Sequence, residues 1–112
     1  MVKWYKDLFL DGITRHTVSL IKNCVEQQKI QYPVFCVAFA SNDKNLLDVL
    51  HVNELLFPYY KRRTTYILGL ASSRQQAKIM AAAIVTKVYQ ETGDFAVREF
   101  FDFGEESKTT SL

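Results

Sequence analysis

Two stretches of the sequence end in the same pair of residues, Ala-Ser, and carry the side chains best suited to hold an anion. Residues 34–43 read VFCVAFASND, and residues 65–74 read TYILGLASSR. Backbone N–H groups at the start of a helix attract anions, and an arginine there adds a positive charge. The predicted anion-binding residues are Ser41, Asn42, Ser72, Ser73 and Arg74.

The serines also have a simpler role, because a hydroxyl group at the start of a helix caps a backbone N–H group. Loops that cradle phosphate are rich in glycine, whereas GLASSR contains a single glycine and no Gly-Lys-Ser/Thr sequence. Both interpretations stay open at this point, a true anion site and a pair of capped helices.

The stretch LLDVLHVNE contains two acidic residues and a histidine at a spacing that could form a general base. Asp48, His51 and Glu54 lie three residues apart, which would place them on one face of a helix. A carboxylate beside an imidazole can make a general base, but the alternative is a solvent-exposed pair on a short helix. Cys24 and Cys36 lie in apolar patterns, which favours reduced, buried thiols. We therefore assign no catalytic residue, no metal ligand and no cofactor.

A basic triplet flanked by tyrosines, YYKRRTTY, is the segment most suited to nucleic acid. Lys61, Arg62 and Arg63 could contact phosphates, and bases could stack on Tyr59 or Tyr60. The formal net charge is only +2, below the basic excess of most nucleic-acid-binding domains, so we do not expect this partner. The triplet also precedes its strand, which predicts that it lies at the opposite end of the sheet from the Ala-Ser turns.

Two aromatic segments, LLFPYY and REFFDFG, could either pack in the core or form an interaction surface. If they are exposed, they would form the interface of a symmetric dimer or the binding surface for a protein partner. The predicted interface residues are Phe57, Tyr59, Tyr60 and Phe103.

Composition indicates one globular domain. The chain has 112 residues, of which 48% are hydrophobic and 23% are charged, as is usual for a domain with a packed core. The start, MVKWYKDLFLDG, predicts no secretory leader, and no apolar window is long enough to span a membrane. We therefore expect a cytoplasmic protein, with residues 1–103 as a single α/β domain and 104–112 as a disordered tail.

Three strands are predicted: WYKDLFL, VFCVAFA and TYILGLA. The last two are apolar throughout, which is typical of strands buried on both faces of a parallel sheet. Helical spacing predicts helices from Thr14 to about Lys29, across NLLDVL, near Asn53 with an end at Pro58, and from Ser72 or Ser73 to Thr92. Gly93 suits the end of the last one. Residues 94–103 fit a strand or a short helix, and we favour the helix.

The two Ala-Ser stretches lie about as far apart as a β-α-β unit requires, which predicts a right-handed crossover between parallel strands. The predicted fold is therefore α/β: a single domain with a small, mainly parallel sheet of three to four strands and helices packed on it. Both Ala-Ser turns would then lie at the same edge, where open α/β sheets bind ligands.

Over residues 3–101 the chain resembles a small, uncharacterised bacterial family associated with anaerobic Gram-positive bacteria. The resemblance rests on WYKDLFL, FASNDKNLLDVL, YILGLA with the long helix after it, and VYQETGDFAVREFF. The sequence departs from the family pattern at ASSR, where the family is richer in glycine. The resemblance implies a bacterial, cytoplasmic α/β domain and brings no activity.

The sequence predicts a non-enzymatic binding or regulatory module that acts through protein interaction and forms a homodimer. The alternative is a small anion-binding protein or enzyme that uses the edge of the sheet with the Ala-Ser turns. Nucleic-acid binding through Lys61–Arg63 is the third possibility.

Overall fold

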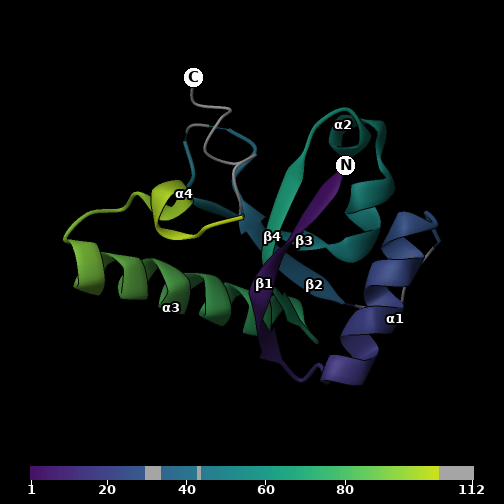
Figure 1. The fold of residues 1–112 in the computed structure, drawn as a ribbon, viewed down its shortest axis with the longest axis horizontal. Coiled ribbons are helices and arrows are strands. Elements are labelled where there is room, and N and C mark those ends of the chain that lie inside the picture. The colour runs from purple at the N-terminus through teal and green to yellow at the C-terminus, as the bar shows by residue number, and fades with distance from the viewer. Residues whose placement is uncertain (30–33, 43, 104–112) are drawn as a thin grey trace.

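The computed structural model describes residues 1–29, 34–42 and 44–103. Its centre is one four-stranded sheet in the order β1-β4-β2-β3 (Figure 1). Strand β1 is parallel to β4, whereas β2 is antiparallel to both β4 and β3. The strands are β1 (Val2–Asp11), β2 (Phe35–Phe39), β3 (Leu47–His51) and β4 (Thr65–Ala71).

Helices cover both faces of the sheet (Figure 1). Helix α1 (Arg15–Glu26) lies on one face, and the long helix α3 (Arg74–Thr92) and short α4 (Val97–Phe100) lie on the other. A 3-10 helix, η1 (Val52–Leu56), and one turn of helix, α2 (Pro58–Lys61), connect β3 to β4. None of the helices among the described residues combines the length and apolar character needed to cross a membrane.

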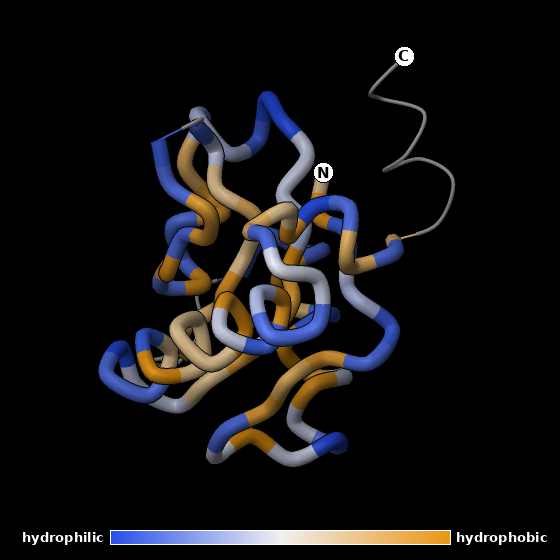
Figure 2. Tube along the Cα trace, turned by 90° about the vertical axis from the view of Figure 1, so that its left-hand side faces the viewer, coloured by the Kyte–Doolittle hydropathy of each residue, from blue (hydrophilic) through white to orange (hydrophobic). Residues whose placement is uncertain are grey.

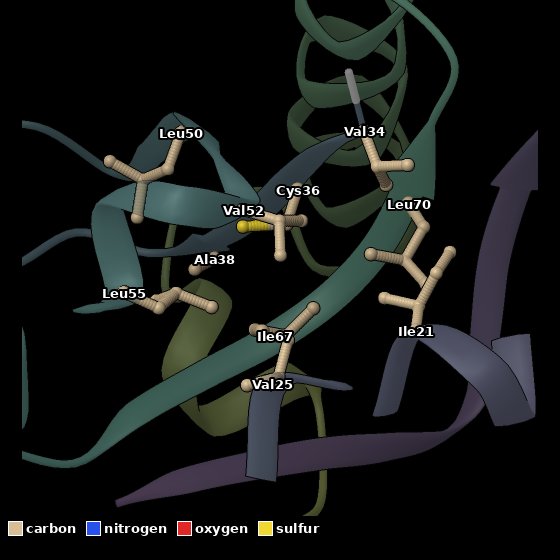
Figure 3. Close-up of a cluster of buried hydrophobic side chains, with 10 residues drawn as sticks. All are labelled: Ile21, Val25, Val34, Cys36, Ala38, Leu50, Val52, Leu55, Ile67 and Leu70. Atoms are coloured by element: carbon tan, nitrogen blue, oxygen red, sulfur yellow. The ribbon is translucent and has the colours of Figure 1, made fainter. Parts of the chain in front are cut away.

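Two apolar cores form because the central strands are buried on both faces. Along β2, Cys36 and Ala38 face α1, whereas Val37 and Phe39 face α3. Figure 3 shows the α1 side, where side chains of α1 meet β4 and the segment from β3 to η1. In Figure 2 the apolar colouring follows the inner strands and the polar colouring gathers at the loops. Burial of these two predicted strands on both faces is confirmed.

The helix ends follow the sequence signals. The Thr14 side chain accepts a hydrogen bond from the backbone of Thr17 and caps α1, and Ser73 does the same for Gln76 and caps α3. Helix α3 ends at Gly93, whose φ of 80° is the left-handed conformation that glycine adopts without strain. The short helix predicted near Asn53 is present as η1, and α4 confirms helix over strand in residues 94–103. The predicted tail, 104–112, lies outside the described residues.

The prediction of a mainly parallel sheet is wrong, and so is the predicted β-α-β crossover. The segment after β2 returns beside it as β3, where a helix over NLLDVL was predicted. Asn42 does not cap a helix: its side-chain oxygen accepts hydrogen bonds from the N–H groups of Lys44 and Asn45 and forms a turn. Leu47 and Val49 then face α3 while Leu50 faces α1, an alternation that packs well only as a strand. Pro58 begins α2 instead of ending a helix.

Gly69 lies where three elements meet. The pairing of β4 shifts register next to it on both sides, and Ile67 and Leu70 consequently face α1 although they are three residues apart. A Cβ atom at Gly69 would collide with the Met80 sulfur and would lie 2.9 Å from the Phe9 carbonyl oxygen. The backbone of β1 and helix α3 can approach β4 this closely only because residue 69 has no side chain.

We therefore expect Gly69→Ala to lower the free energy of unfolding by about 1–3 kcal/mol, the usual cost of overpacking a core. Urea denaturation of the two proteins would measure the loss. Ala81→Gly is the matched control, because it also changes a single methyl group, at a half-buried position of α3. It should cost about 1 kcal/mol through helix propensity. A Gly69→Ala protein as stable as the original would contradict the close packing of Phe9 and Met80.

Candidate functional site

The two Ala-Ser turns lie at opposite ends of the sheet. Phe35, at the start of β2, is paired with Ala71 at the end of β4. The residues that follow β4 are therefore near the start of β2, and the residues that follow β2 are near the start of β4. The five residues predicted to bind an anion consequently do not form one site.

Residues 72–74 have structural partners at their end of the sheet. The Ser73 hydroxyl accepts the Gln76 N–H at 3.1 Å as a helix cap, and the Ser72 N–H donates to the Asp11 carbonyl. The Arg74 guanidinium lies over the Phe35 ring, 5.0 Å from its centroid. This half of the predicted site matches the simpler interpretation, a capped helix with a cation–π contact.

At the other end, Arg63 reaches the first Ala-Ser turn. Its Nη2 donates to the Ser41 carbonyl at 2.9 Å and its Nη1 to the Tyr59 hydroxyl at 2.7 Å. The prediction that the basic triplet lies away from both turns is wrong for this turn. Because β2 is antiparallel to β4, the start of β4 and the end of β2 are neighbours.

A second arginine, Arg98 of α4, lies beside the first. Its Nη2 donates to the Ala40 carbonyl at 2.6 Å, and its guanidinium lies 5.1 Å from the centroid of the Phe39 ring. Arg63 and Arg98 therefore bind the carbonyl groups of two consecutive residues. Arg98 was not among the predicted site residues, because no motif surrounds it and it lies 58 positions from Ala40.

The two arginines line a hollow of about 440 Å³ between the β2–β3 loop, the start of β4 and α4. A smaller cleft of about 90 Å³ beneath the start of β4 shares Ala40, Ser41 and both arginines with it. Polar side chains at the hollow include Ser41 and Asn42 of the predicted set. The remaining lining residues are Asn45, Leu46, Phe95, Ala96, Val97 and Glu99.

Among the described residues, the charged side chains that line the two cavities are Arg63 and Arg98, Glu99 at the hollow and Asp48 at the cleft. Within residues 1–29, 34–42 and 44–103, no ion pair joins either Arg63 or Arg98 to a carboxylate. Asp48 lines the small cleft, but its Oδ2 accepts the Ser41 N–H at 3.0 Å. A guanidinium carries five N–H donors, so both arginines keep donors beyond those bound to the protein. We call Arg63, Arg98 and Ser41 the arginine site.

The Asp48, His51 and Glu54 group does not share a helix face. Asp48 and His51 are on β3 and Glu54 is on η1. The His51 Nδ1 accepts the Asn53 N–H at 3.0 Å, and the Glu54 Oε2 accepts the His51 N–H at 2.7 Å. His51 and Glu54 thus form a capping box for η1, and Asp48 holds the turn after β2.

The residues of the basic triplet have different surroundings in the structure, and so do the predicted interface residues. The Lys61 Nζ donates to the Gln28 side chain near α1, Arg62 is exposed, and Arg63 turns to Ser41. Of the predicted interface residues, Phe57 and Tyr59 are exposed. Tyr60 packs against the α1 core and Phe103 against the α3 core, so the four do not form one patch.

Thiols and metal ligands give no second site within the described chain. No three His, Cys, Asp or Glu side chains there could hold a metal ion together. Cys36 is fully buried, and Cys24 is half-buried. Comparisons of the sequence with protein-family models and with curated proteins, and of the structure with solved structures, found no match.

Burial, with a smaller contribution from the Glu54 charge, raises the pKa of the Cys36 thiol from 9.0 to about 12. The folded protein therefore holds this proton when the unfolded chain releases it. The free energy of unfolding should fall as pH rises through the window between these two pKa values. Urea denaturation at about pH 8 and about pH 10 should show a steeper loss for the original protein than for Cys36→Ala. Equal losses would contradict a buried, protonated thiol.

Proposed function

We propose that the protein is a non-enzymatic binding module that anchors an anionic group of its ligand at Arg63 and Arg98. The observation that carries the proposal is the convergence of two guanidinium groups on consecutive carbonyls, at the edge of a hollow. Glu99 also lines the hollow, but within the described residues it forms no ion pair with either arginine, so both guanidinium groups keep N–H donors for a bound anion. Arginine also matches carboxylate and phosphate oxygens through paired N–H groups.

Binding without catalysis fits the other residues at the hollow. The described residues that line it include neither histidine nor cysteine, so none of them places an imidazole beside Ser41 as a general base. Exposed Leu46 and Phe95 offer apolar contact area next to the arginines. A ligand with a carboxylate or phosphate group attached to an apolar part uses both properties of the site.

Location, family and oligomeric state are separate predictions. A cytoplasmic location, the resemblance to a bacterial family and a homodimer agree with this function but do not support it. Nucleic-acid binding through the basic triplet is not favoured, because Lys61, Arg62 and Arg63 have different surroundings and do not present one phosphate-binding surface.

Titration with inorganic phosphate at low ionic strength, followed by NMR, tests the arginine site. We expect saturable shifts of the backbone signals of Ala40 and Ser41 and of the side-chain signals of both arginines. Arg63→Gln and Arg98→Gln should each weaken the binding about 10- to 100-fold, because a hydrogen bond to a charged group contributes about 1.5–3 kcal/mol.

Arg62→Gln is the matched control, since it removes the same charge from an exposed neighbour that does not line the hollow. It should leave the affinity within about twofold, the scale of a screened surface charge. If Arg62→Gln weakens binding as much as Arg63→Gln, the phosphate affinity depends only on net charge. That result would contradict a specific anion site at Arg63 and Arg98.

A further inference from the structure

The two outer strands of the sheet differ in how their free edges are protected. Strand β1 loses register between Trp4 and Phe9, so it bulges there, and the bulge carries the charged residues Lys6 and Asp7. Bulges and edge charges are the usual means by which proteins prevent a sheet from adding further strands. Strand β3 is regular along its whole length and is not interrupted by a bulge.

Hydrogen bonding shows which backbone groups of β3 face outward. The Ala40 N–H donates to the Leu46 carbonyl and the Val52 N–H to the Val34 carbonyl, so the even-numbered residues of β3 bond to β2. In an antiparallel pair the residues between them point their N–H and C=O groups away. These are Leu47, Val49 and His51.

Among the described residues, one of these three N–H groups has a side-chain acceptor. The His51 N–H donates to Glu54, as described for η1. Within the described residues, the N–H groups of Leu47 and Val49 have no such side-chain acceptor. Side chains do not block access to this edge by charge, because Leu47 and Val49 are apolar and Asp48 is turned toward the Ser41 N–H.

We infer that β3 pairs antiparallel with β3 of a second copy of this chain, about a two-fold axis at Val49. In that register Val49 lies opposite its own copy, and Leu47 lies opposite His51. The two Val49 residues then exchange N–H and C=O bonds. Each Leu47 N–H meets a His51 carbonyl, which also starts the hydrogen bonding of η1 and has a second lone pair. The strand is thus complementary to itself, as a two-fold interface requires.

The side chains agree with a second copy as the occupant. The one charged carboxylate of the strand, Asp48, lies opposite Leu50 in this register, so no like charges oppose each other. Leu47 and Val49 of the two copies meet on the α3 face and extend its apolar core. With five residues in the strand, the interface is short, and we expect a concentration-dependent dimer. This inference does not depend on the arginine site.

Amide hydrogen exchange by NMR, with light scattering on the same samples, tests the pairing. At high protein concentration the Leu47 and Val49 amides should become protected as the dimer forms, and at low concentration they should exchange rapidly. The Asp48 and Leu50 amides bond to β2 and should be protected at both concentrations, which provides an internal control. A protein that stays monomeric, or Leu47 and Val49 amides that exchange rapidly in the dimer, would overturn the inference.

Val49→Pro removes the outward N–H group and none of the bonds to β2, so it should yield a monomer with unchanged secondary structure. Val49→Thr is the matched control, because it keeps both the N–H group and the branched side chain, and it should remain dimeric. A Val49→Pro dimer would show that another surface, such as Phe57 and Tyr59, holds the copies together. If Val49→Pro does not fold, the exchange measurement on the original protein decides alone.

Discussion

The antiparallel pairing of β2 with β4 determines which of the segments after β2, before β4 and after β4 are neighbours. It carries the end of β2 to the start of β4, and so brings Ser41 to Arg63 while it separates Ser41 from Ser72. Strand β4 also holds β1 on its other side, where Gly69 allows the Phe9 backbone to approach. A parallel arrangement of the same two strands would have placed both Ala-Ser turns together and left Arg63 at the far end.

The end of β2 also explains why two arginines gather there. Where a strand leaves its sheet, its carbonyl groups lose their partners, and a buried unpaired carbonyl is costly. Arg98 and Arg63 satisfy the carbonyls of Ala40 and Ser41, and each guanidinium also lies over an aromatic ring, of Phe39 or Tyr59. The same two side chains therefore stabilise the turn and, in the proposed function, bind the anion. Substitutions there need a stability measurement beside a binding one.

Local signals in the sequence predicted much of the fold. The caps at Thr14 and Gly93, and the cap at Ser72 or Ser73, depend on neighbouring residues only, and the structure has all three, with Ser73 as the cap of α3. The segment LDVLH was assigned wrongly because its apolar residues also fit a helix, and its pairing with β2 depends on a turn at Asn42. Arg98 lay beyond prediction, since a contact with a carbonyl group distant in the sequence leaves no pattern. Ser41 and Asn42 were predicted for an anion site and Arg63 for nucleic acid at the other end of the sheet, and only the fold brings Arg63 and Arg98 to this turn.

The pairing of β1 with β4 has a consequence for the order in which the chain can assemble on the ribosome. Strand β1 is synthesised before the other three strands, yet its neighbour in the sheet of described residues comes after α1, the β2–β3 hairpin, η1 and α2. Until β4 emerges, β1 has no partner strand, and the hairpin exposes the second edge of β2 as well as that of β3. The nascent chain therefore passes through a stage with more unpaired strand edges than the finished protein, which is when it most needs protection from neighbouring copies.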